Sequence, residues 1–175
     1  MKIAVIGYSG SGKSTLAKRI SEEYSLPLLY LDTVHWLPDW CERDTEEAQK
    51  IVSDWMDTHD SWVIDGNYRK YYRERKFEEA DYIVFLAFPR LRCLYRAWKR
   101  SRTFRGKSRD SMTMGCDEKF DREFVLWILK NGRSREIVKA YRDTGKRYAN
   151  KFYRCTCDRQ VNRFLEMLQK TEAAK

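Results

Sequence analysis

Short runs of apolar residues alternate along the chain with longer segments in which apolar residues recur every three or four positions. Runs of the first kind are typical of buried parallel strands, and segments of the second kind are typical of amphipathic helices. The predicted strands cover residues 2–6, 28–31, 61–64, 82–88 and 151–156. The predicted helices cover residues 13–24, 45–58, 91–102, 120–130, 134–148 and a last segment capped by Asp158.

The order of these elements predicts the fold class. Strands that alternate with helices of ten or more residues form right-handed βαβ units, which build a parallel sheet covered by helices on both faces. A chain of 175 residues suits one compact domain, and 42% hydrophobic with 35% charged residues is typical of a globular protein. We therefore expect a single three-layer α/β domain over residues 1–175, with five parallel strands.

The sequence also bears on cellular location. Its apolar runs fall short of the roughly 18 residues that a membrane span requires. After Met1-Lys2, a run of only four apolar residues precedes Gly7, which is too short for the apolar region of a signal peptide. The five cysteines form neither an even set nor a C-x-x-C pair, so a disulfide framework and a zinc ribbon are not indicated. We expect a cytoplasmic protein without a membrane partner.

The charge is strongly basic. Lys and Arg number 35 against 26 Asp and Glu, which gives a net charge of +9 and predicts an anionic partner. Nucleotide, nucleic acid and acidic membrane all fit that charge. Between residues 90 and 109 the chain carries nine cations and no acid before Asp110. Because such cations repel one another, we expect this run to meet an anionic guest.

The most specific motif begins where the first strand ends. Residues 7–14 read GYSGSGKS and match the phosphate-binding pattern G-x-x-x-x-G-K-[ST]. Glycines let backbone amides turn toward phosphate oxygens, and the helix that follows aims its positive end at the same anion. Lys13 then reaches the β- and γ-phosphates of ATP, and the Ser14 hydroxyl ligates Mg²⁺. The predicted nucleotide-binding residues are Gly7, Ser9, Gly10, Ser11, Gly12, Lys13, Ser14 and Thr15.

Two aspartates stand at the carboxyl ends of predicted strands, where the ligand crevice of an α/β fold opens. Asp65 ends the strand at 61–64, and an Asp in this position can hold Mg²⁺ directly or through water. Asp32 follows the strand at 28–31 and would face the acceptor of a phosphoryl group. The alternative for each is a helix cap or a turn former.

Arginines supply cations for a transferred phosphoryl group, which gains most from charge neutralisation and exclusion of water. Arg96 and Arg100 are four residues apart and share one helix face. The polar stretch 101–118 is predicted to be a mobile lid that carries Arg102, Arg105 and Arg109.

With these residues in view, the chain resembles P-loop kinases of the nucleoside-monophosphate-kinase-like group, which are related to adenylate kinase. Asp65-Gly66-Asn67-Tyr68-Arg69 resembles the Asp-Gly-Phe-Pro-Arg strand end of that group. The resemblance implies that Asp65 serves Mg²⁺ and that the Arg69 guanidinium grips phosphate. Arg96 and Arg100 match the paired arginines before its lid. It also implies a P-loop fold with the strand order 2-3-1-4-5.

A closer resemblance, over nearly the whole chain, is to the bacterial topology modulation proteins (FlaR-related). The shared features are Leu31-Asp32, His35-Trp36, Trp40, the stretch 62–68, the stretch 114–118, Phe124 and Trp127. Two features depart from adenylate kinase. The acceptor region 33–43 is short and aromatic, and Asn67-Tyr68 replaces Phe-Pro. AMP is therefore not carried over as the acceptor.

These observations lead to one hypothesis, an ATP- and Mg²⁺-dependent transfer of the γ-phosphoryl group to a small acceptor, with nucleosides and nucleotides among the candidates. The catalytic residues are predicted to be Lys13, Asp32, Arg96 and Arg100, with Asp32 orienting or deprotonating the acceptor. The predicted substrate-binding residues are Asp32, His35, Trp36, Trp40, Asp65, Gly66, Asn67 and Arg69. Trp36 and Trp40 serve equally well as core or interface residues. The alternative is an ATP-dependent DNA-associated regulator whose basic run contacts duplex phosphates.

Overall fold

The structure is a computed structural model that describes residues 1–104, 109–118 and 120–173. Its central sheet contains β1 (Lys2–Gly7), β2 (Leu28–Tyr30), β5 (Trp62–Asp65), β6 (Tyr82–Leu86) and β7 (Phe152–Cys155). The strands are parallel and lie in the order β2-β5-β1-β6-β7. Numbered along the chain, this is the order 2-3-1-4-5, so the predicted sheet is confirmed.

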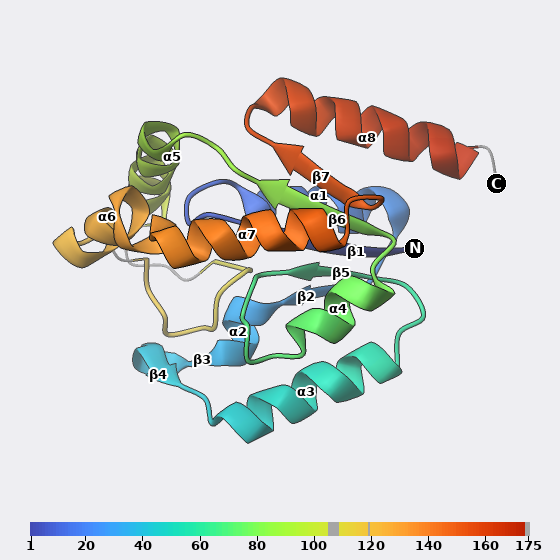
Figure 1. Cartoon of the computed structure of the whole chain (residues 1–175). Helices are drawn as coiled ribbons and strands as arrows, with labels where there is room; N and C mark the ends of the chain where they lie inside the picture. Colours follow the sequence, from blue (N-terminus) through green and yellow to red (C-terminus); the bar gives the residue numbers. More distant parts are fainter. Residues whose placement is uncertain (105–108, 119, 174–175) are drawn as a thin grey trace.

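Helices cover both faces of this sheet (Figure 1). One face packs against α1 (Lys13–Tyr24), α5 (Arg90–Thr103) and α8 (Asp158–Ala173). The other packs against α2 (Leu31–His35), α3 (Thr45–Asp57), α4 (Arg73–Glu79) and α7 (Arg135–Arg147). Helix α6 (Arg122–Leu129) packs against α5. The predicted three-layer α/β fold is therefore confirmed.

The central strand shows why the predicted strands are continuous apolar runs. In β1, Ile3 and Val5 point into one core cluster, whereas Ala4 and Ile6 point into the cluster on the opposite face. All four side chains are fully buried. A strand with helices on both faces needs apolar residues at every position, and this need removes the polar alternation of a half-exposed strand. In the described ranges, no helix is long and apolar enough to cross a bilayer.

Several short elements were not predicted from the sequence. Leu31 begins α2 instead of ending a strand, and the aromatic region after α2 forms a small antiparallel pair, β3 (Trp36–Leu37) and β4 (Cys41–Glu42). Helix α4 was missed because six of its seven residues are charged, which leaves no apolar periodicity to detect. It docks on the sheet through Phe77, which is 1% exposed.

The same helix buries a lysine. Lys76 is 1% exposed, and its Nζ donates a hydrogen bond of 2.6 Å to the backbone oxygen of Gly66. Burial lowers the pKa of Lys76 to about 7, against the opposing attraction of the Asp65 carboxylate. The lysine thus fixes the turn that follows β5. Keeping its ammonium group charged in this buried position lowers the free energy of unfolding.

This burial predicts a pH-dependent stability. The pKa is about 10.5 in the unfolded chain and about 7 in the folded chain, so between these values the unfolded chain binds more protons. The free energy of unfolding should therefore rise with pH in that window because of Lys76, by up to about 1 kcal/mol per pH unit. Urea unfolding of the wild type and of Lys76→Met at pH 7.5 and 9 should show this gain in the wild type only. The exposed Lys50→Met is the matched control, and parallel pH curves for wild type and Lys76→Met would contradict the prediction.

Candidate active site

The loop between β1 and α1 runs extremely close to α5. A Cβ atom added to Gly10 would lie 2.4 Å from the backbone oxygen of Cys93, and Gly10 has a φ of +73°. Gly12 has a φ of +94°, and a Cβ there would lie 3.3 Å from Nη1 of Arg96. Only glycine adopts a positive φ and leaves room for such a close approach without strain. The path of the loop therefore explains why glycines stand at these positions of the motif.

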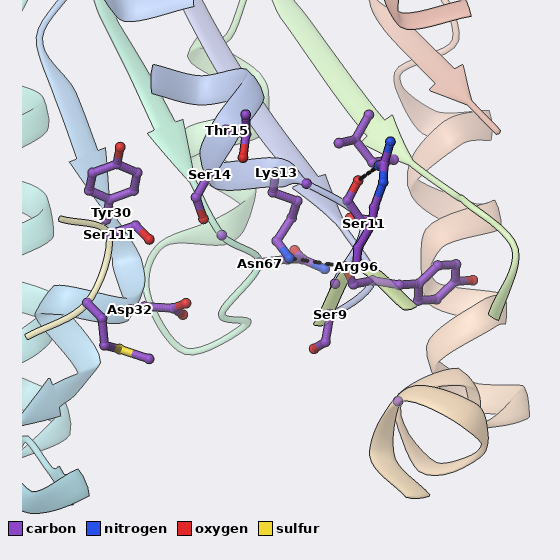
Figure 2. A pocket seen from close by; sticks show the side chains of 18 of the residues that line it. Ser9, Ser11, Lys13, Ser14, Thr15, Tyr30, Asp32, Asn67, Arg96 and Ser111 are labelled. Atoms are coloured by element: carbon purple, nitrogen blue, oxygen red, sulfur yellow. Dashed lines mark hydrogen bonds between the residues drawn. The ribbon is translucent and has the colours of Figure 1, made fainter. Parts of the chain in front are cut away.

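Lys13 and Ser14 start α1 and face the same space as Asp32 (Figure 2). The Lys13 Nζ donates to the backbone oxygen of Tyr8 at 3.3 Å, so its side chain lies back over the loop. The Ser14 Oγ donates to Oδ2 of Asp65 at 2.6 Å. The structure thus brings together the cation and the two oxygen groups that the sequence predicted for phosphate and Mg²⁺.

Asp65 has the properties of a group that receives a cation. The residue is 4% exposed, and its Oδ1 finds no hydrogen-bond partner among the described residues. Burial raises its pKa to about 6, while the nearby Lys13 charge acts in the opposite direction. The hydroxyl of Ser14 and this carboxylate are hard oxygen ligands of the kind that Mg²⁺ prefers. Within the described ranges, His, Cys, Asp and Glu form no group of three or more that could hold a metal ion.

Asp32 faces the same cleft, and a tyrosine fixes its carboxylate through a hydrogen bond. The Tyr68 hydroxyl donates to Oδ1 of Asp32 at 2.8 Å. Burial and the Asp32 charge both raise the pKa of Tyr68, so the phenol keeps its proton and is the donor. His35 is buried, and its Nδ1 lies 2.7 Å from the hydroxyl of Tyr71. Burial lowers the pKa of His35, so the ring is neutral at pH 7.

The two predicted tryptophans lie beside these groups. The rings of Trp36 and Trp40 meet edge to face with centroids 5.4 Å apart, and Trp36 makes a similar contact with His35 at 4.5 Å. Both line the same cleft as Asp32 and the phosphate loop. This placement fits the predicted wall of an acceptor pocket.

The arginines on α5 are paired with acids from distant parts of the chain. Arg96 donates to the backbone oxygen of Ser11 at 2.9 Å and pairs with Asp158 at 2.8 Å. Arg92 also pairs with Asp158, and Arg100 pairs with Glu118. Acids from outside the cationic run therefore offset part of its charge, and the expected anionic guest stays a prediction.

The three predicted lid arginines are placed differently. Arg109 lines the cleft and pairs with Glu118. Arg102 is exposed, stacks 5.2 Å over the Trp98 ring and does not line the cleft. Arg105 lies outside the described residues.

The described part of the predicted lid packs against the body of the protein. Met112 and Cys116 are buried, so the expectation of a stretch too polar to pack is wrong for these residues. The Thr113 hydroxyl donates to the backbone oxygen of Thr33 at 3.3 Å. Asp110 pairs with Lys18 on α1 at 2.6 Å. Residues 109–118 therefore connect the acceptor region with the nucleotide side of the cleft.

Together these groups line one cleft of about 1990 Å³. A pocket for one small ligand typically measures about 300–1,000 Å³, so the cleft has room for two molecules side by side. Of the predicted site residues, it contains those of the phosphate loop together with Asp32, His35, Trp36, Trp40, Gly66, Asn67, Arg69, Arg96, Arg100 and Arg109. Asp65 lies just beneath it, bonded to Ser14.

Sequence reasoning missed several residues that shape the cleft. Tyr68 holds Asp32, and the indole of Trp127 donates to Oγ of Ser9 at 3.1 Å. The hydroxyl of Tyr141 donates to the backbone oxygen of Gly7 at 3.3 Å. Trp127 and Tyr141 are more than 100 residues away from their partners, and no local spacing signals such contacts. Tyr68 lies inside the motif 65–69, but the sequence marks it only as a departure from the Asp-Gly-Phe-Pro-Arg pattern and gives no sign of its contact with Asp32.

Comparison with known proteins supports the fold. Neither a protein-family model nor a curated protein sequence matches the chain. Among solved structures, shikimate kinase from Acinetobacter baumannii in complex with shikimate is 13% identical with a TM-score of 0.58, over 99% of this chain and 94% of that chain. Deoxyadenosine kinase from M. mycoides with bound dATP is 15% identical with a TM-score of 0.58, over 97% of this chain and 100% of that chain. The protein thus has the three-layer α/β fold of P-loop kinases, whereas the resemblance to topology modulation proteins stays a prediction.

Proposed function

We propose that this protein is an ATP-dependent phosphotransferase that moves the γ-phosphoryl group of ATP to a small acceptor. The observation that carries the proposal is the position of Lys13, Ser14 and Asp32 around a single cleft, with Asp65 bonded to Ser14 beneath it. This arrangement provides a phosphate cradle, hard oxygen ligands and a carboxylate that can receive a proton.

On the nucleotide side, the loop amides and the start of α1 bind phosphate oxygens, and Lys13 leaves the backbone oxygen of Tyr8 to meet the β- and γ-phosphates. Ser14 and Asp65 would hold Mg²⁺, which neutralises charge on the phosphates when it is bound. Trp127 and Arg133 contact the loop: the Trp127 indole donates to Oγ of Ser9, and the Arg133 guanidinium lies 3.8 Å from the centroid of the Tyr8 ring.

On the acceptor side, Asp32 is the group that orients and deprotonates a hydroxyl. Its Oδ1 accepts from Tyr68, which fixes the carboxylate and leaves Oδ2 for the acceptor. Trp36 and Trp40 give this part of the cleft an aromatic wall. Such a wall suits an acceptor with an apolar or planar body, such as a nucleoside.

The first test is a screen of nucleosides, nucleotides and small alcohols for release of ADP from ATP. With the acceptor so found, Lys13→Ala should lower kcat/KM by about 10²-fold or more, because the variant loses a cation at the transferred group. Circular dichroism should show an intact fold. The exposed Lys170→Ala is the control, and full activity in a folded Lys13→Ala protein would contradict the proposal.

A second test concerns the metal. Asp65→Asn removes a carboxylate whose charge is unfavourable in its buried place, so the melting temperature at pH 7.5 should change little. The same variant should need more Mg²⁺ to reach half of its own maximal rate, and this rate should be lower. Asp60→Asn, an exposed aspartate before β5, is the control. A large loss of stability at unchanged specific activity would show that Asp65 only supports the turn.

The rival function is an ATP-dependent DNA-associated regulator, and the outer face of α5 is the observation that favours it. Lys99 and Arg102 are exposed there beside Tyr95 and Trp98, and Arg90 is exposed at the start of the helix. If DNA binds through these three cations, affinity should fall about 40-fold between 50 and 200 mM salt. Replacing the three cations by Gln should then reduce the salt slope by up to about three. Under our proposal, the triple variant releases ADP at the wild-type rate and no such salt-dependent complex forms.

A further inference from the structure

A single buried carboxylate joins two arginines in the wall of the cleft. The Glu118 side chain is 5% exposed. Its Oε1 accepts from Nε of Arg100 at 2.7 Å and lies 2.5 Å from Nη2 of the same guanidinium. Its Oε2 lies 2.6 Å from Nε of Arg109. Glu118 therefore uses both oxygens, one for each arginine.

The two guanidiniums need this acid in order to lie close together. Burial and the charge of Arg109 both lower the pKa of Arg100, and the charge of Glu118 opposes them. Two cations and one anion leave a net positive charge of one on the cleft wall. The Nη1 of Arg109 donates to Oγ of Ser111 at 3.2 Å. Each arginine has five N–H donors, so N–H groups that neither Glu118 nor Ser111 engages remain for an anion.

The two arginines come from different segments of the chain. Arg100 belongs to α5, whereas Arg109 and Glu118 belong to the stretch 109–118. Elsewhere this stretch is fastened to the acceptor region, where the Cys116 thiol donates to the backbone oxygen of Leu37 at 3.1 Å. Glu118 thus links the acceptor side of the cleft to the helix that braces the phosphate loop.

We propose that Glu118 is a positioning residue that holds the guanidiniums of Arg100 and Arg109 at adjacent points of the cleft, where they receive the phosphoryl group in transit. This inference rests on the proposed phosphotransferase function. Glu118 contacts both arginines and acts through them. It acts by neutralising one of two like charges, by fixing the direction of the Arg100 guanidinium through a hydrogen bond, and by holding Arg109 through an ion pair.

The substitution Glu118→Gln keeps the shape of the side chain and removes its charge. The two arginines then repel each other, and Arg109 moves away with its segment. The cleft gains one unit of positive charge, so a nucleotide in its ground state should bind as well as before or better. Affinity should be lost only for a state in which both arginines must hold the phosphoryl group during its transfer.

The binding experiment compares MgADP with MgADP plus aluminium fluoride, which stands in for the transferred phosphoryl group. In the wild type the fluoride complex should bind more tightly than MgADP alone. In Glu118→Gln this gain should fall about 10-fold, because misplaced groups lose much of their effect, while the Kd of MgADP does not rise. Glu118→Asp, which keeps the charge on a shorter side chain, should be intermediate. Asp117→Asn removes the exposed neighbouring acid and is the matched control.

A second measurement needs no ligand. Trypsin should cleave after Arg109 faster in Glu118→Gln than in the wild type or in Asp117→Asn, because the pair that fixes Arg109 is lost. Arg109→Gln breaks the same link from its other end and should lower the aluminium fluoride gain by a similar factor. The Arg109→Gln variant allows the same measurement if Glu118→Gln fails to fold.

The outcomes separate the two proposals. An undiminished fluoride gain in Glu118→Gln, or a larger gain, would overturn the positioning role. So would an equal loss of affinity for MgADP and for the fluoride complex, since that would indicate general damage to the site. A wild-type protein that binds neither MgADP nor MgATP would instead contradict the proposed function, and the cleavage rate after Arg109 would still decide whether Glu118 fixes the arginine.

Discussion

The pairing of β1 with a parallel strand on each side is the constraint on which the site depends. Val5 lies beside Asp65 of β5, and Gly7 lies beside Leu86 of β6. The carboxyl ends of the three strands therefore meet at one edge of the sheet, and the chain after Gly7 must turn in the narrow space between its neighbours. That turn gives the loop its glycines and places Ser14 within 2.6 Å of Asp65. The geometry of the loop after Gly7 therefore follows from the position of β1 between β5 and β6.

Charge is the second constraint, because this edge of the sheet collects cations from α1, α5 and the stretch 109–118. Asp158 balances Arg92 and Arg96, and Glu118 balances Arg100 and Arg109. These acids do not cancel the cations, since each carboxylate serves two arginines. They hold a positive cleft together without a ligand, and they direct the guanidinium groups. A cleft prepared in this way favours charge that develops during a reaction over charge that is already present in the bound substrate.

The sheet could be predicted from the sequence because buried strands and amphipathic helices leave strong periodic signals, and the phosphate loop because its spacing reflects backbone geometry. Helix α4 left no such signal, since its docking relies on Phe77 and on a lysine that becomes buried only in the tertiary structure. The sequence likewise gives no sign of which acids pair with the arginines of α5. Asp158 is 62 residues from Arg96, and its apparent purpose in the sequence is to cap the last helix. Local patterns reveal elements, whereas the partners of charged side chains are set by topology.

The departure from the adenylate kinase pattern has a structural consequence at the acceptor side. Where that pattern has Pro, this chain has Tyr68, whose hydroxyl reaches Oδ1 of Asp32. The phenol keeps its proton because burial and the neighbouring carboxylate both raise its pKa, so the direction of the hydrogen bond is fixed. A proline offers neither a donor nor an aromatic ring at this position. Tyr68 also lies against His35, with ring centroids 4.6 Å apart, and so joins the carboxylate to the aromatic wall. Under the proposed function, this oriented carboxylate within an aromatic enclosure is what an acceptor would meet, and the residue that departs from the family pattern is the one that orients it.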